Sequence, residues 1–289
     1  MNRGMLQAAL AYIAWGLFPL YFRELDGVGA FEIVLHRVAW SLAFLALILL
    51  WQRRWQWLGA LRLQPMVLAM FTLSALVLAA NWLTYVWAVS NGHVIDASLG
   101  YFINPLVSVA LGTFVLHERL RRWQRVAVAL AAAGVLWLAA LGPNIPWVGV
   151  VIAVTFGLYG LMRKTAALGA LEGLTLETLL LAPPAIGLLA WWTWQGSGGL
   201  AHHGPATLGW LIGLGPMTSI PLLLFAAGAR RISLATLGLL QYISPTIQLA
   251  LGLWIFGESL SGQRLAGFAL IWVALAVFSI EGLLRAQRR

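Results

Sequence analysis

The stretch that decides the fold is DASLGYFINP, which occupies residues 96–105. A similar stretch, ATLGLLQYISP, returns in the second half of the chain at residues 235–245. Pro105 matches Pro245 at a separation of 140 residues, whereas the residues before each proline match best at 138. The second copy therefore carries two extra residues just before its proline. Such self-similarity predicts a chain built from two related halves.

The two matching prolines carry a structural consequence. A proline inside a helix leaves the carbonyl one turn back without its usual donor. Within a membrane this is tolerated only where protein or a wet cavity satisfies the freed group. Helix breaks at corresponding places in two halves are typical of transport sites. We therefore expect bending or unwinding near Pro105 and Pro245, with Asn104 and Gln241 facing a central cavity, and we take both prolines as candidate gating residues.

Composition assigns the chain to the membrane. Of its 289 residues 61% are hydrophobic and only 9% are charged, and the mean hydropathy is +0.87. Soluble proteins have about 25% charged residues. The net charge of +9 would suggest a nucleic-acid partner in a soluble protein, but here the basic residues lie in short loops between apolar runs. The sequence therefore favours a lipid bilayer as the surroundings and excludes nucleic acid as a partner. The absence of cysteine excludes disulfides.

Ten apolar stretches have the length that crosses a bilayer as a helix. The expected spans are residues 5–22, 32–50, 67–90, 94–116, 123–140, 146–162, 172–193, 206–229, 233–256 and 263–283.

The distribution of basic residues sets the orientation. Fifteen of the eighteen Lys and Arg residues fall at the two ends of the chain or in every second loop, and only Arg23 and Arg264 fall in the alternate loops. The positive-inside rule then places both termini in the cytoplasm. Each half has five spans, and an odd number reverses the second copy relative to the first. We expect an all-α integral membrane protein with inverted repeats at residues 1–143 and 144–289.

Charged residues inside spans are candidates for function because they are costly in lipid. Arg37 and Glu177 occupy equivalent positions of the two halves with opposite charge. They could form a structural ion pair between the halves, or face the cavity and bind substrate or relay a proton. His36, which lies beside Arg37, is a candidate coupling residue because histidine titrates near neutral pH.

Aromatic and amide side chains deep in the spans form a second group. Amides beside aromatic faces suit an amphipathic or cationic solute, although amides also hydrogen-bond neighbouring helices. Asp96 begins the fourth span. There it would either interact favourably with the helix dipole or take part in gating. The remaining candidates for substrate binding are Trp15, Asn81, Trp82, Tyr101, Tyr159 and Tyr242.

Several motifs resemble the EamA family of the drug/metabolite transporter superfamily, and within it the RarD-type group. The motifs are Asn81-Trp82 with Trp87-Ala88-Val89, the block 97–106, Gln241-Tyr242-Ile243, and the segment 268–276. The resemblance covers almost the whole chain, and it departs at Asp96, where a glutamate is expected more often. It implies a multi-pass protein of the bacterial inner membrane that exports small organic solutes.

Nothing in the sequence predicts an enzyme, because it lacks a glycine-rich phosphate loop, an HExxH motif and a nucleophile elbow. We expect no cofactor and no metal site. The favoured function is a secondary transporter, either monomer or homodimer, that moves small amphipathic metabolites or drugs such as amino acids by alternating access. Coupling to protons stays open. The alternatives are a regulatory membrane protein without transport and a flippase for lipid-linked intermediates.

The inverted topology can be tested with single cysteines, because the chain has none. We expect Glu118→Cys and Glu258→Cys to react with a membrane-impermeant thiol reagent from opposite sides of the membrane. Labelling of intact cells and of inverted vesicles distinguishes the sides. Reaction of both positions from the same side would contradict the inverted repeat.

Overall fold

The computed structural model describes residues 3–53, 55–61, 64–141, 146–198, 203–257 and 261–286. Every regular element in these ranges is a helix. The helices are α1 (Arg3–Gly16), α2 (Phe18–Arg23), α3 (Ala30–Gln52), α4 (Gln56–Leu61), α5 (Pro65–Ser90), α6 (Val94–Phe114), α7 (Arg122–Ala140), α8 (Trp147–Thr165), α9 (Ala170–Gln195), α10 (Pro205–Ala229), α11 (Leu234–Gln241), α12 (Ile243–Trp254) and α13 (Gly262–Ala286).

The expected number of spans is confirmed. Within the described ranges ten helical stretches are long and apolar enough to cross a membrane. The first combines α1 with α2, and the ninth combines α11 with α12. The short helix α4 lies between the second and third spans and was not expected.

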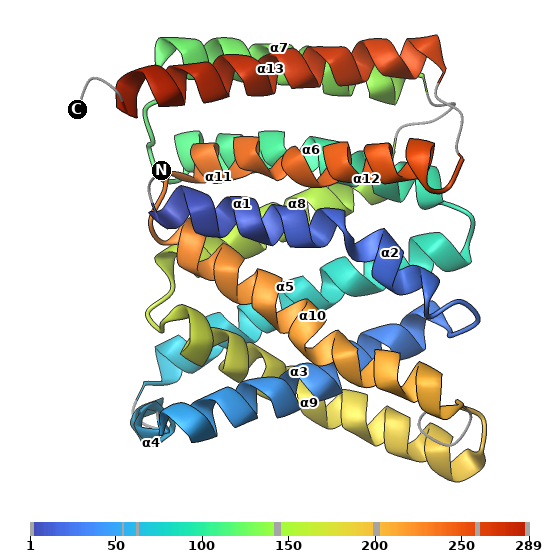
Figure 1. Cartoon of the computed structure of the whole chain (residues 1–289). Helices are drawn as coiled ribbons and strands as arrows, with labels where there is room; N and C mark the ends of the chain where they lie inside the picture. The colour runs from blue at the N-terminus through green and yellow to red at the C-terminus, as the bar shows by residue number, and fades with distance from the viewer. Residues whose placement is uncertain are drawn as a thin grey trace.

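The structure is an inverted repeat, and its packing pairs equivalent helices of the two halves (Figure 1). Helices α6 and α11 lie antiparallel: Gly238 faces the Pro105 carbonyl oxygen, while Leu234 lies beside Gly112, farther along α6. Helices α7 and α13 form an outer layer in the same way, and α3 packs on α9.

Glycines permit these close contacts between backbones. A Cβ atom built on Gly238 would lie only 2.7 Å from the Pro105 oxygen and 2.9 Å from the Ser108 Cβ. In lipid, helices associate through close packing of small residues, because the lipid tails are as apolar as the helices themselves. The contact of α6 with α11 therefore depends on glycine, which has no side chain, at position 238.

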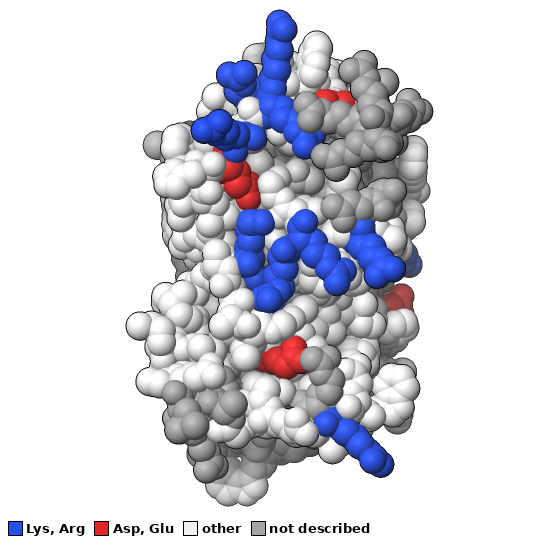
Figure 2. All heavy atoms as spheres, turned by 90° about the vertical axis from the view of Figure 1, so that its left-hand side faces the viewer, with Lys and Arg blue, Asp and Glu red and all other residues white. Residues whose placement is uncertain are grey.

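Basic residues gather at one end of the helices, which we call the basic end. It carries Arg3 and Ala286, so the described chain begins and ends on the same side (Figure 1). Figure 2 shows this face, with lysines and arginines spread over much of it. Arg23 and Arg264, by contrast, lie at the other ends of their spans, which we call the opposite end.

Two expectations fall outside the described residues. The proposed boundary between residues 143 and 144 lies in the gap at 142–145, and Glu258 lies in the gap at 258–260. The limits of the two repeats therefore stay a prediction, as does the side of the membrane that Glu258 faces.

The glycine contact gives a stability prediction. We expect Gly238→Ala to destabilise the protein by about 1–3 kcal/mol, because the added methyl group overpacks the contact with α6. The control is Gly187→Ala in α9, where nothing lies within 4 Å of the added Cβ. Thermal melting of both variants in detergent checks this. A melting temperature of Gly238→Ala equal to that of the control would contradict it.

Candidate functional site

A central cavity of about 340 Å³ lies between the two halves. Helices of both repeats contribute to its wall, from α1 through α12, and its volume falls within the range of small-molecule sites, roughly 300–1,000 Å³. The structure brings together eight of the residues that the sequence singled out: Trp15, Arg37, Asn81, Trp82, Tyr101, Asn104, Gln241 and Pro245.

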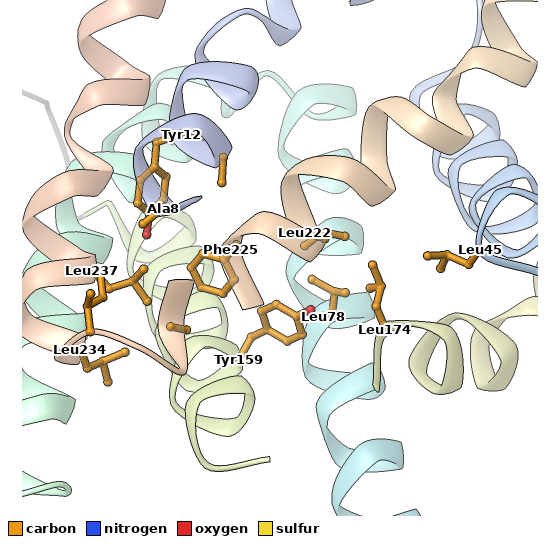
Figure 3. Packing of buried hydrophobic residues seen from close by; sticks show 13 residues of the cluster. Ala8, Tyr12, Leu45, Leu78, Tyr159, Leu174, Leu222, Phe225, Leu234 and Leu237 are labelled. Carbon is orange, nitrogen blue, oxygen red and sulfur yellow. The ribbon is translucent and has the colours of Figure 1, made fainter. Parts of the chain in front are cut away.

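Towards the basic end, the cavity meets a cluster of buried apolar residues. Tyr159 stacks on Phe225 with ring centroids 6.0 Å apart, and Tyr12 and Leu222 pack in the same cluster (Figure 3). In the other direction the cavity extends to Phe22 in α2 and to Val89 near the end of α5. The cavity therefore extends towards the opposite end.

A polar network lies on the basic side of this apolar cluster. Glu118 accepts hydrogen bonds from the backbone N–H groups of Leu234 and Ala235, at 2.8 and 3.1 Å. An acid at this position satisfies free donors at the start of α11 and interacts favourably with its dipole. Lys164 lies 3.6 Å from Glu118 and donates to the carbonyl oxygen of Ile232. These contacts join the loop after α6 to α8 and α11.

Arg37 of α3 is the charged group of the cavity wall. Its Nε donates to the Thr218 hydroxyl at 3.1 Å. This hydrogen bond does not use the two terminal amino groups of the guanidinium. The guanidinium carbon lies 4.5 Å from the centroid of the Trp82 ring, so the cation rests on an aromatic face. No carboxylate among the described residues forms an ion pair with Arg37.

Amide groups line the wall but are partly occupied by protein. Asn81 donates from Nδ2 to the Ile152 oxygen at 2.8 Å and to the Thr155 hydroxyl at 2.9 Å. Asn104 accepts from the Ser108 hydroxyl at 3.4 Å. Hydrogen bonding between helices, the alternative that the sequence left open, thus explains part of the role of Asn81.

The ion pair expected as one alternative for Arg37 and Glu177 is wrong. Glu177 lies 3.5 Å from Arg163, and each of these two side chains is only 1% exposed. The Glu177 carboxylate also accepts from Ser74 at 2.6 Å and from Tyr159 at 3.2 Å. Sequence alignment of the halves located equivalent positions, but equivalent positions on inverted helices need not face each other.

A void of about 10 Å³, room for roughly one water, lies beside Glu177. Trp82 and Leu222 line both this void and the large cavity. Ser219 also faces it, and its buried hydroxyl has no partner among the described residues. The void beside Glu177 and the large cavity therefore share part of their walls, Trp82 and Leu222.

The helix break expected near Pro245 is confirmed. Near Pro105 the expected unwinding is wrong, and the expected bend stays a prediction. The ninth span is interrupted at Tyr242, between α11 and α12, whereas α6 runs as one helix through Pro105. The two extra residues in the second copy would rotate a continuous helix by about 200° at 3.6 residues per turn. The interruption itself is confined to Tyr242, whose backbone keeps right-handed helical angles of φ −60° and ψ −13°.

The other candidates lie outside the cavity wall. Tyr242 donates to the Phe102 oxygen at 3.2 Å, and Asp96 in the first turn of α6 lies 3.2 Å from His93. His36 is buried, and its Nδ1 accepts from Trp40 at 3.2 Å. Its Nε2 lies 3.8 Å from Glu32, an acid at the opposite end.

Glu32 also lies 3.0 Å from His203, in the segment before α10. His202, the neighbour of His203, is outside the described residues. The described residues hold no group of three or more histidines and acids able to bind a metal ion.

Sequence reasoning missed Arg163 and Tyr85. Arg163 stands next to Lys164 at a span end, so it was counted among the loop cations, although its side chain turns inward. Tyr85 lies one helical turn after Asn81, on the same face of α5, and this spacing could have added it to the list. The cavity wall further includes Ser244, Gln248 and Phe156.

The fold and the cavity define the class of protein: a polytopic membrane protein with a solute-sized site between inverted repeats, the arrangement of secondary transporters. The profile of the EamA-like transporter family matches residues 2–140. The chain is 46% identical to Protein RarD of Streptomyces exfoliatus, over 99% of this chain and 90% of that protein. It is 41% identical to Protein RarD of Escherichia coli, over 99% of this chain and 97% of that protein.

A third relative, an uncharacterized transporter of Pseudomonas aeruginosa, is 45% identical over 97% of this chain and 94% of that protein. The fold also matches a crystal structure with a TM-score of 0.72, covering 95% and 96% of the two chains at 20% identity. The chain belongs to the EamA-like transporter family, and its named relatives place it with the RarD proteins.

The pairing of Glu177 with Arg163 gives a second prediction. Removing one member of a buried pair costs about 3–5 kcal/mol, so we expect Glu177→Gln and Arg163→Gln each to lower the melting temperature strongly. The double variant should recover much of the loss, because neither charge is left alone.

The matched control is the combination of Glu177→Gln with Arg37→Gln, whose effects should add, because these residues do not touch. A double-mutant cycle by thermal melting measures both couplings. Equal coupling in the two cycles would contradict the assignment of Arg163 as the partner.

Proposed function

We propose that this protein is a secondary transporter that moves small amphipathic organic metabolites or drugs, amino acids among the candidates, across the bacterial inner membrane. The observation that carries the proposal is the cavity of about 340 Å³ between the inverted halves, with an aromatic wall and a few polar groups. A regulatory protein without transport would have no need of such a cavity.

Alternating access requires that the cavity be closed on one side at a time. The apolar cluster around Tyr159 and Phe225, with Glu118 and Lys164 beyond it, acts as the closed gate at the basic end. The positive-inside rule assigns the basic end to the cytoplasm. This conformation then faces the periplasm, and opening the gate requires α8 and α11 to separate.

Export against a gradient requires a source of energy. The sequence holds no glycine-rich phosphate-binding loop, so we assign the energy to a gradient of protons or of another solute. Glu177 is the candidate proton carrier, because the void beside it shares Trp82 and Leu222 with the wall of the cavity.

Transport is tested by flux into liposomes that contain the purified protein, with a panel of labelled organic acids, amino acids and amines. We expect flux of at least one member above that of protein-free liposomes. Trp82→Leu should lower this flux about tenfold, since it removes the ring that packs on Arg37 in the cavity wall, a contact worth about 1–2 kcal/mol. The control is Trp194→Leu, a tryptophan 78% exposed at the end of α9. Absence of flux across the whole panel would overturn the proposal.

A further inference from the structure

The charge of the cavity wall identifies the kind of solute more narrowly than its size does. Of the described residues that line the cavity, Arg37 alone carries a formal charge, and neither aspartate nor glutamate lines it. The charged groups nearest to Arg37 in the chain do not neutralise it, because Glu32 lies with His36 and His203. The cavity therefore has a net positive charge.

An unpaired cation in these surroundings is costly. A charged side chain in the middle of a span costs about 2.5–3.5 kcal/mol on insertion scales, and such residues normally pair with an opposite charge. Glu177 and Glu118 follow this rule, with Arg163 and Lys164 as partners. Arg37 differs from them, since its contacts are a hydroxyl and an aromatic ring.

Two phenols complete the surroundings of Arg37. Tyr85 and Tyr101 line the same cavity as Arg37, with ring centroids 6.3 Å apart. Neither hydroxyl has a hydrogen-bond partner among the described residues. A phenol can donate one hydrogen bond, and the guanidinium retains the two terminal amino groups. These donors converge on one part of the cavity.

Aromatic rings form the neighbouring wall. Trp15 and Phe156 pack edge to face at 5.6 Å, and both line the cavity. This wall suits a flat apolar body. The face of Trp82 is already covered by Arg37, so it is not free to receive a cationic group from a solute. A cation in the cavity would also meet the charge of Arg37 in surroundings of low dielectric constant.

We propose that the cavity binds an organic monoanion: a carboxylate held by Arg37 with Tyr85 and Tyr101, joined to an aromatic or apolar body that rests against Trp15 and Phe156. Arginine binds carboxylates through two parallel hydrogen bonds, which fixes the orientation of the solute. An ammonium group on the solute weakens binding, because it loses its hydration and no described carboxylate lines the cavity to receive it. This inference rests on the proposed transport function and narrows its substrate class to organic acids.

The test compares four ligands of similar shape on the full-length protein in lipid nanodiscs: 3-phenylpropionate, 3-phenylpropanamide, 3-phenylpropylamine and phenylalanine. We expect the acid to bind at least tenfold more tightly than the amide and than phenylalanine, and the amine to bind least. Isothermal titration calorimetry gives the four affinities. Binding of the amine as tight as that of the acid, or binding of none of the four, overturns the inference.

Variants test whether Arg37 is the residue that recognises the carboxylate of the ligand. Arg37→Gln should lower the affinity for the acid to that for the amide, and Arg37→Lys should keep the preference for the acid. The control Arg264→Gln removes a cation at the opposite end of the molecule and should leave all four affinities unchanged. An unchanged ratio of acid to amide in Arg37→Gln overturns the inference.

Binding and flux separate this inference from the function on which it rests. A protein that carries solutes into liposomes but binds the acid without preference keeps the transport function and loses the anion site. A protein that binds the acid through Arg37 but moves no member of the labelled panel keeps the site and loses the function.

Discussion

The bilayer offers no hydrogen bonds to the chain, and the rest of the structure depends on this constraint. Backbone groups must be satisfied within helices, which explains why every described regular element is one. The same constraint applies to side chains: Glu177 has Ser74, Tyr159 and Arg163 around it, and Glu118 has the free N–H groups of α11. Arg37, whose charge has no such partner among the described residues, differs from these acids and lines the cavity.

Much of the architecture could be predicted from the sequence, because hydropathy and loop charge are strong signals in a membrane protein. The repeat around Pro105 and Pro245 gave the two halves, and residues beside those prolines, Asn104 and Gln241, line the cavity. Trp82 and Arg37 were selected because polar or aromatic side chains deep in a span are candidates for function. A charged side chain in lipid is costly.

What could not be predicted depends on how the helices cross. Glu177 was paired with Arg37 by symmetry, but the direction in which its side chain points is set by the packing of α9 on α5 and α8. Tyr159 was expected in the cavity and lies instead in the apolar cluster beneath it. Arg163 lies near the end of α8, where a side chain can point inward or outward. The composition of the sequence does not decide between these directions.

The interruption at Tyr242 has a consequence for the energetics of the whole cycle. It exists in the ninth span and has no counterpart in α6. Inverted repeats with identical halves would give two end states of equal free energy, each populated half of the time in a symmetric membrane. For the proposed alternating cycle, an interruption present in only one half contributes to a difference in free energy between the two end states, even with no gradient and no solute.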